Sequence, residues 1–484
     1  MSSPKAWSAL PLALAMAGCV SMAPTYRVPD PPIPKAWPED AFAGAADKPG
    51  TTATSLAWQD FYTDAGLRKV LSLALEHNRD LRIAALNTEK AQAYYRIQRS
   101  NLFPTVSAIG SVSRVRSTSS ASGTVTDYTV GLGVSAWEID FFGRIRSLKN
   151  RSLELYLATE QARRSAHISL LSEVANLYLA LAADQDSLKF ARETLASQET
   201  SANLIRRRFE VGISSELDAN RAQISLETAR EDAARLTSLV AMDRHALNLL
   251  VGTIVPAELL PGPLDGFAPF QDIAPGLPSD ALIQRPDIHA AENQLKAANA
   301  NIGAARAAFF PSISLTAGVG TASSELSGLF KSGSGTWAFA PQAILPIFDL
   351  GARRANLQAA KADRDIALAQ YERTIQSAFR EVADTLTQRA ALEEQLAAHV
   401  SLVKALEKTH ALASARYSAG IDGYLSVLDA QRSLYAAQQG LIALRQARYG
   451  NQITLYKVLG GGWNRPSQPA AAKAPTESRP SSGG

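Results

Sequence analysis

The residues with the most potential for chemistry lie near the C-terminal end of the chain, just after Gly420. Asp422, Leu425, Asp429 and Arg432 follow one another at intervals of three, four and three residues. In an α-helix this spacing places side chains on one face. Asp429 and Arg432 could form an ion pair there. On spacing alone, a solvated helix face is the favoured interpretation.

The other reactive side chains show no arrangement typical of an enzyme. The histidines include no pair at ligand spacing with a third ligand nearby, so we expect no metal site. No strand-to-helix glycine loop of the phosphate-binding kind occurs, and nothing suggests a nucleophile–base pair. These side chains therefore indicate neither the active site of an enzyme nor a cofactor site. The six histidines are His77, His167, His245, His289, His399 and His410.

The charge distribution does not favour a nucleic-acid partner. The net charge is +4, and the densest basic run, 206–208, comes at the end of a predicted helix. Cations at that position suit the helix macrodipole. No run of 18 or more apolar residues follows the N-terminal region, so we expect no transmembrane helix.

The chain contains an internal duplication. Gly143 and Gly351 are 208 residues apart, and so are Gly212 and Gly420. Two further pairs agree at 207 residues: Pro104 with Pro311, and Asp80 with Asp287. A repeat of this length indicates one structural unit present twice. Gly212 and Gly420 each end a long proline-free run, so we expect them to form turns at helix tips.

The single cysteine, Cys19, lies where an N-terminal signal peptide should end. Residues 1–18 combine Lys5, an apolar stretch and a small-residue end, which is typical of a signal peptide. The ending Ala17-Gly18-Cys19 resembles a bacterial lipoprotein signal, which implies lipidation of Cys19. The alternative is an ordinary signal peptide with an incidental cysteine. We expect residues 19–63, which are rich in proline up to position 49, to form an extended linker.

Periodicity predicts the same succession of elements in both halves. Each half has a helix, a β-hairpin, a very long helix and a shorter helix. If helical throughout, the long segment 144–211 would span ~100 Å. Repeat 1 covers 64–251, with the hairpin at 104–137, the long helix at 144–211 and the last helix at 214–251. A connector follows at 252–278, and repeat 2 covers 279–459, with its hairpin at 311–346 and helices at 352–419 and 422–458. The tail 460–484 is expected to be disordered.

The strands favour a membrane barrel over a soluble sheet. Between positions 128 and 136, apolar residues alternate with small polar ones, as they do in 312–320. The alternative is two soluble hairpins packed on a core. Strands of about ten residues suit a bilayer, where open edges are not tolerated. Four strands cannot close and eight leave only room for side chains, so twelve strands from a homotrimer are expected.

Several long motifs resemble those of the outer-membrane factor family, the relatives of TolC, and within it the OprM/NodT-type efflux lipoproteins. The resemblance covers the whole mature chain. The motifs are Asp140–Arg146, Leu277–Asp280, Arg285–Ile288, Ala298–Pro311 and Leu425–Arg432.

This resemblance implies an α+β membrane protein. A trimeric 12-stranded outer-membrane β-barrel, with four strands per chain, would continue into a long periplasmic α-helical barrel, with an equatorial belt formed by the connector and the terminal segments. Such channels bind a periplasmic adaptor (membrane fusion) protein and an inner-membrane RND-type transporter. They export drugs or other small molecules from Gram-negative cells without covalent chemistry. Metal-ion efflux, a type I secretion duct and a non-transporting, lipid-anchored periplasmic coiled-coil scaffold remain as alternatives.

The resemblance also implies a periplasmic gate. The positions of Leu425, Asp429 and Arg432 form the constriction at the periplasmic tip in that family, and Asp422 precedes them on the same predicted stripe. Three copies would place rings of carboxylates and leucines across a lumen, which hold cations and resist wetting. The first-repeat counterpart is less regular and consists of Leu217, Asp218 and Arg221.

Overall fold

The computed structural model describes residues 21–34, 36–37, 52–116, 123–274, 282 and 284–463. The predicted signal peptide, Cys19 and the tail beyond 463 lie outside these residues. The chain divides into two compact units. The sheet unit comprises Met1–Pro31, Ala85–Ala162 and Asp287–Thr374, and the tip unit comprises Pro32–Ala84, Arg163–Pro286 and Ile375–Gly484.

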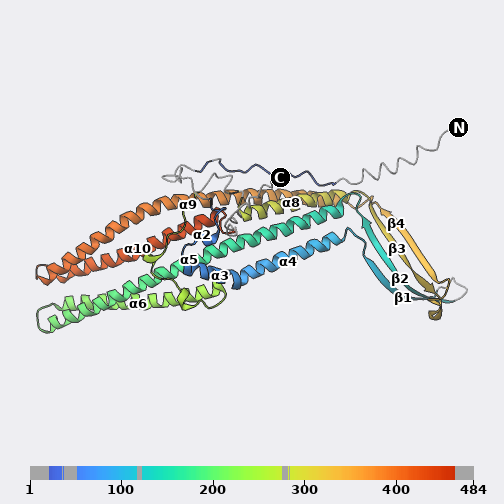
Figure 1. Cartoon of the computed structure of the whole chain (residues 1–484). Helices are drawn as coiled ribbons and strands as arrows, with labels where there is room; N and C mark the ends of the chain where they lie inside the picture. The colour runs from blue at the N-terminus through green and yellow to red at the C-terminus, as the bar shows by residue number, and fades with distance from the viewer. Residues whose placement is uncertain are drawn as a thin grey trace, which may run out of the picture. The chain divides into compact units, whose positions relative to one another are not determined.

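The sheet unit contains one antiparallel sheet of four strands in the order β1-β2-β3-β4 (Figure 1). The pairing of β2 with β3 joins the two sequence repeats in a single sheet. The prediction of an α+β fold with four strands is confirmed. The strands are β1 (Val106–Arg116), β2 (Thr124–Ile139), β3 (Ser312–Ser323) and β4 (Gly335–Ile344).

The register gives the sheet two chemically different faces. Ala108, Leu132, Val319 and Trp337 are paired in one line across all four strands, and the residues two positions away on this face are mostly apolar. The adjacent line, on the opposite face, reads Ile109, Gly131, Gly320 and Thr336. This separation follows from the period of two along each strand.

A β-bulge interrupts the predicted alternation in β2. The pairing with β3 shifts between Val134 and Trp137. Ala136, which the sequence pattern placed on the apolar face, has a φ of 49°, and its N–H donates to Thr316 Oγ1 at 3.1 Å. After the bulge, Trp137 resumes the apolar face opposite Leu315. The bulge therefore adds one residue to β2, and the alternation of faces continues after it, displaced by one position.

The two 67-residue helices begin in the same way. In α5 (Arg144–Glu210), the carboxylate of Asp140 accepts hydrogen bonds from the backbone N–H groups of Ile145 and Arg146. In α9 (Ala352–Ser418), Asp349 accepts from the backbone N–H of Arg353. Carboxylates suit these positions because the first N–H groups of a helix have no partners within it.

The first helix of repeat 1 differs from its prediction. The single helix expected between residue 64 and the hairpin is two helices, α3 (Ala65–His77) and α4 (Arg79–Ser100), separated by Asn78 in an extended conformation. In repeat 2, α8 spans Pro286–Ala307 and begins with proline at its first position, which is a favoured place for it.

In the tip unit, the second half of each long helix pairs with a shorter helix to form an antiparallel hairpin (Figure 1). The partners are α6 (Glu216–Val251) for α5 and α10 (Tyr424–Val458) for α9. The remaining short elements are α2 (Trp58–Phe61) and the 3-10 turns η2 (Ala257–Leu259) and η3 (Leu264–Gly266) in this unit, and η4 (Leu326–Gly328) in the sheet unit.

An aromatic cluster ties the connector to other segments of the tip unit. The ring of Phe61 stacks on Tyr456 of α10 at 4.0 Å and on Phe270 of the connector at 5.3 Å between centroids. Separately, the ring of Trp37 stacks on Phe379 of α9 at 5.0 Å. The N-terminal segment is therefore packed at Trp37, where the proline content predicted an extended linker.

One described helix, α5, contains an 18-residue stretch with the hydropathy of a membrane span. Of that stretch, 61% is buried inside the protein. Val174 and Leu181 of α5 have no solvent exposure. Burial of this degree is typical of a helix that packs in a protein core.

Candidate functional site

Both hairpins of the tip unit turn at the glycines predicted for this role. Gly212 has a φ of 75° and Gly420 a φ of 71°, which is the left-handed region. The next residue donates its N–H back to the helix: Ile213 to the carbonyl of Arg208 at 2.8 Å and Ile421 to that of Arg416 at 2.9 Å. This glycine-based helix end satisfies carbonyls that have no partner within the helix.

The two hairpins pack against each other near these turns through a tip cluster. Ile205 and Leu428 are each 1% exposed, so the cluster excludes water at its centre. Burial of such side chains stabilises by ~1.5–3 kcal/mol each. The buried members are Ala202, Ile205, Ala222, Leu226, Tyr424, Val427 and Leu428.

Two polar contacts also join the hairpins. The guanidinium of Arg208 donates to the hydroxyl of Tyr417 at 3.1 Å and lies 5.4 Å from the centre of its ring. Further from the turns, Arg432 Nη2 donates to Ser225 Oγ at 3.3 Å. Each contact links a residue of repeat 1 to a residue of repeat 2.

Three of the predicted gate residues lie together on the exposed face of α10. Leu425 is 44% exposed, and Asp429 and Arg432 are exposed as well. Within the described residues, Asp429 has no ion-pair partner, so the possible Asp429–Arg432 pair is not formed. Arg432 instead binds Ser225.

The fourth predicted gate residue, Asp422, is not on this stripe. It lies in the turn before α10, which begins at Tyr424 and not at 422. Both carboxylate oxygens of Asp422 accept hydrogen bonds from Arg416, at 2.5 and 3.0 Å. These bonds hold the pKa of Asp422 below its ordinary value. Asp422 therefore closes the turn and leaves Asp429 as the free carboxylate of the set.

The first-repeat residues have a different arrangement. Leu217 is 58% exposed at the start of α6. Asp218 accepts from the hydroxyl of the helix-capping residue Ser215 at 2.7 Å and lies 3.9 Å from Arg221. With the repeat offset of 208, Arg221 corresponds to Asp429, so the charge at this position is reversed between repeats.

Sequence reasoning missed the residues that join the hairpins. The run 206–208 was interpreted only as a cationic helix end, although its last member binds Tyr417. One feature of the sequence could have indicated a contact at the tip: an aromatic residue, Phe209 or Tyr417, lies three positions before each tip glycine.

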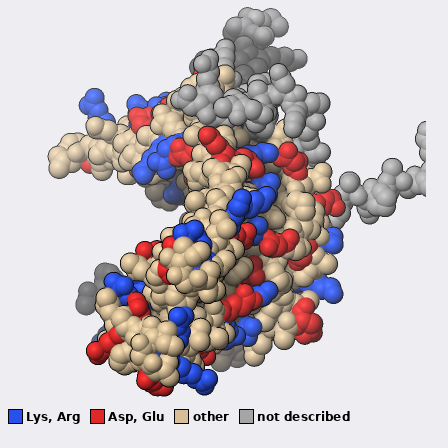
Figure 2. All heavy atoms as spheres, turned by 90° about the vertical axis from the view of Figure 1, so that its left-hand side faces the viewer, with Lys and Arg blue, Asp and Glu red and all other residues tan. Residues whose placement is uncertain are grey.

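The surface of the tip unit carries charges of both signs, intermixed over the face shown in Figure 2.

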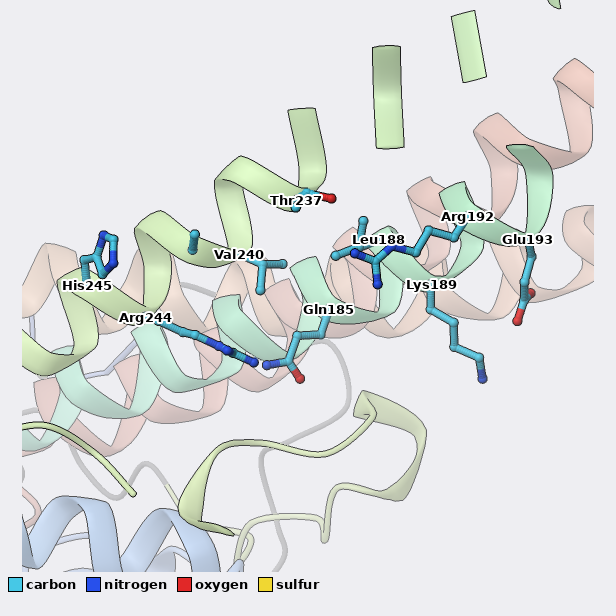
Figure 3. Close-up of a pocket in the computed structure, with 10 residues that line it drawn as sticks. Gln185, Leu188, Lys189, Arg192, Glu193, Thr237, Val240, Arg244 and His245 are labelled. Atoms are coloured by element: carbon cyan, nitrogen blue, oxygen red, sulfur yellow. The ribbon is translucent and has the colours of Figure 1, made fainter. Parts of the chain in front are cut away.

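A cleft of about 690 Å³ lies between α5 and α6 (Figure 3). Its charged lining residues are Lys189, Arg192, Glu193 and Arg244. Cations outnumber the one carboxylate in this lining, so the cleft can attract anionic groups. None of the described residues forms a cluster of three or more potential metal ligands.

The chain matches a family model twice. The model for outer membrane efflux proteins covers residues 70–253 and 277–461. The chain belongs to the outer membrane efflux protein family. The two matches coincide with the two sequence repeats, and the family resemblance inferred from the motifs is confirmed.

Relatives of this efflux protein are similar over nearly their whole length. The toluene efflux pump outer membrane protein TtgC of Pseudomonas putida is 47% identical over 471 residues, which cover 96% of this chain and 97% of that protein. Outer membrane protein OprJ of Pseudomonas aeruginosa is 42% identical over 463 residues, which cover 94% of this chain and 96% of that protein.

Solved structures of outer-membrane channels share the fold of this efflux protein. The open state of the MtrE outer membrane channel from Neisseria gonorrhoeae superposes with a TM-score of 0.85 at 38% identity, over 93% of this chain and all of that chain. The CmeC outer membrane channel from Campylobacter jejuni gives a TM-score of 0.85 at 26% identity, over 93% of this chain and 96% of that chain. The chain is therefore an outer-membrane efflux channel protein.

Proposed function

We propose that this efflux protein is the homotrimeric outer-membrane channel of a tripartite pump and conducts small molecules passively. The observation that carries the proposal is the four-stranded sheet with one apolar face and with β1 and β4 at its edges. An edge strand in a bilayer leaves backbone groups without partners, which costs several kcal/mol per group. Pairing β4 of one chain with β1 of the next would close a twelve-stranded barrel.

The assembly part of this proposal has a direct test. The protein purified in a mild detergent should have the mass of three chains, measured by native mass spectrometry or light scattering. A monomer that retains its strands under these conditions would contradict closure across chains.

The cargo is proposed to be drugs, solvents and similar small organic molecules. Relatives at 47% identity are named as a toluene efflux pump component and an antibiotic efflux pump component. The partners are proposed to be a periplasmic adaptor and an inner-membrane RND-type transporter, and the channel itself would carry out no catalysis. Metal-ion efflux and type I secretion are the competing cargo assignments.

The gate is proposed to lie at Leu425, Asp429 and Arg432. Their exposed face on α10 is next to the tip cluster, which fixes the helix. Arg432 binds Ser225 of the other hairpin, and the exposed side chains of Leu425 and Asp429 would face a lumen. Three symmetry-related leucines would form an apolar constriction, and three Asp429 carboxylates would form a cation-binding ring beside it.

Anchoring at the membrane is proposed to include a lipid on Cys19. Ala17-Gly18-Cys19 at the end of the predicted signal peptide supports this. Labelled palmitate should be incorporated into the wild type and not into Cys19→Ser. Absence of label in both would contradict the lipid anchor and leave the barrel to hold the protein alone.

The experiment that tests the function is deletion of the gene, followed by complementation. The deletion strain should become more sensitive to antibiotics, dyes and toluene, and the wild-type gene should restore resistance. Parallel plates with metal salts and an assay of secreted proteins separate the competing cargo classes. Unchanged sensitivity to every organic compound, together with sensitivity to metals or loss of secretion, would overturn the proposed cargo.

A further inference from the structure

Helix α8 has a face that contacts the N-terminal segment residue by residue. Five residues of α8 recur at intervals of four, three, four and three, which places them on one face of the helix. We call these residues the cradle, and we call residues 22–26 the arm. The cradle consists of Glu292, Lys296, Asn299, Gly303 and Arg306.

The cradle binds the backbone of the arm. Arg306 Nη1 donates to the carbonyl of Met22 at 3.2 Å. Two helical turns earlier, Asn299 Nδ2 donates to the carbonyl of Pro24 at 2.8 Å. The arm therefore runs antiparallel to α8, and its carbonyls replace water with fixed donors.

Gly303 lies between these two contacts and makes room for the arm. A Cβ atom added at Gly303 would lie 2.8 Å from the backbone nitrogen of Ala23 and 2.6 Å from Ser147 Oγ. Because ordinary Cβ contacts are longer than 3.0 Å, any larger residue would displace the arm or the facing helix. The glycine is thus required by the close approach of the arm.

The far end of the arm is held by a side chain. The hydroxyl of Tyr26 donates to Glu292 Oε1 at 3.2 Å, and the ammonium group of Lys296 lies 5.4 Å from the centre of the Tyr26 ring. Lys296 also pairs with Glu292 at 2.8 Å. Burial, together with the nearby Glu292, raises the pKa of Tyr26, so its hydroxyl stays a donor.

The described residues of the first repeat show no such arrangement on α4, the helix that corresponds to α8. At the offset of 207, Asn299 and Arg306 correspond to Gln92 and Arg99 of α4, and Gly303 corresponds to Arg96. None of the residues of α4 is buried. The cradle is therefore a specific property of the second repeat and not a consequence of the shared fold.

We propose that the cradle is a docking site that holds the lipidated N-terminus at the foot of strand β3. Met22 contacts Arg306, which lies six residues before the start of β3 at Ser312. Met22 follows Cys19 by only three positions, so this stretch of chain can span at most ~10 Å. This role rests on the lipidation of Cys19 proposed above. A tether this short would keep the strands close to the membrane into which the lipid inserts, and so at a high effective concentration there.

Mobility of the arm tests the docking itself. Thr25 is exposed, so a nitroxide attached to Thr25→Cys should not disturb the cradle. The label should be immobilised in the otherwise wild-type protein and at least tenfold more mobile in Gly303→Leu. Arg96→Leu, the matched change in repeat 1, should leave it immobilised. A label that is equally immobile in Gly303→Leu, or equally mobile in all three proteins, would overturn the docking site.

A second variant guards against misfolding of Gly303→Leu. The double substitution Asn299→Ala and Arg306→Ala removes both bonds to the arm without adding bulk, and should also raise the mobility of the label. If Gly303→Leu alone frees the arm, the effect comes from misfolding and the docking site is contradicted.

Amount of assembled protein tests the role in anchoring. At equal palmitate labelling, the double variant should give several-fold less oligomer in the outer membrane than the wild type. Unchanged assembly with a mobile arm would overturn the anchoring role. Absence of palmitate in the wild type would contradict only the lipid anchor, because the mobility measurement does not depend on it.

Discussion

Asn78 and Arg285 occupy equivalent positions in the two repeats, and each ties the start of a helix to the end of another. Asn78 Nδ2 donates to the carbonyl of Leu250 at 2.7 Å, and Arg285 Nη1 donates to the carbonyl of Val458 at 2.9 Å. Leu250 and Val458 are themselves 208 residues apart. The duplication has therefore kept the contact while the side chain that makes it has changed.

We expect Asn78→Ala to destabilise the tip unit. Asn78 also accepts from the backbone N–H of Leu81 at 2.7 Å, so it caps α4 while it binds the end of α6. Loss of a cap and a buried hydrogen bond should cost about 1–3 kcal/mol. The midpoint of thermal unfolding in detergent should fall, whereas Asn87→Ala on the exposed face of α4 should leave it unchanged. Equal midpoints for the two variants would contradict this role.

Tyr417→Phe should make the tip easier to open. It removes the hydroxyl that accepts from Arg208 at 3.1 Å but keeps the ring that the guanidinium contacts. A link that contributes about 1 kcal/mol in each of three chains could shift a closed–open equilibrium, which turns on a few kcal/mol. Single-channel recordings in planar bilayers should show a higher open probability. Tyr424→Phe removes a hydroxyl inside the tip cluster and is the control. Identical open probability for Tyr417→Phe and wild type would show that this link does not hold the tip.

The sequence predicted the repeat, the strand faces and the helix tips because each depends on local pattern. Gly212 and Gly420 take left-handed conformations, as their positions after long helices indicate. The break at Asn78 was missed because no proline or glycine marks it. It exists because the Asn78 side chain binds Leu250, which is distant in the sequence.

The same limit applies to the candidate site. Spacing placed Leu425, Asp429 and Arg432 on one face, and α10 presents them that way. Spacing alone also assigned Asp422 to the stripe, although its contact with Arg416 keeps it in the turn. Contacts between segments, such as that of Arg208 with Tyr417, leave no periodic signal in one sequence.

Gly320→Ala should prevent the sheet from forming correctly. A Cβ atom at Gly320 would lie 2.4 Å from the carbonyl oxygen of Val130 in the neighbouring strand. At Gly335, at the start of β4, nothing lies within 4 Å of an added Cβ, so Gly335→Ala is the matched control. We expect Gly320→Ala to reduce the oligomer recovered from outer membranes at least several-fold and Gly335→Ala to have little effect. Normal recovery of both proteins would contradict this prediction, because it would mean that β2 and β3 can move apart to admit the Cβ atom without any loss of assembly.

The carboxyl group of Asp184 should make the folded protein less stable as the pH rises from the pKa of this group in the unfolded chain to its pKa in the folded protein. Burial raises the pKa of Asp184 to about 7, with the hydrogen bond to Asp243 and the charge of Asp243 adding to it, while Arg235 opposes the shift. In the unfolded chain the carboxyl ionises near pH ~3.9. Between these values the folded state binds more protons, so stability falls with pH and levels off above about 7.

Asp243→Asn should flatten this dependence, because it removes the neighbouring negative charge. The difference should be on the order of 1 kcal/mol once solvent screening of the half-exposed pair is discounted. Thermal midpoints measured from pH 4 to pH 8 would show it, with Glu231→Gln on the exposed face of α6 as the control. A wild-type profile that rises with pH over this interval would contradict the assignment.

Replacing Leu425, Asp429 and Arg432 by alanine should raise the single-channel conductance in a planar bilayer. The three side chains are exposed on α10, and among the described residues only Arg432 has a polar partner in the other hairpin. Their loss should therefore widen a constriction and cost little stability. Asp429→Ala alone should weaken block by divalent cations entering from the tip side, because the carboxylate ring would be absent. The matched triple change Leu217→Ala, Asp218→Ala and Arg221→Ala in the first repeat should have a smaller effect. The carboxylate of Asp218 already accepts a hydrogen bond from Ser215 and pairs with Arg221. If the second-repeat variant forms normal oligomers but conducts as the wild type does, the gate lies elsewhere.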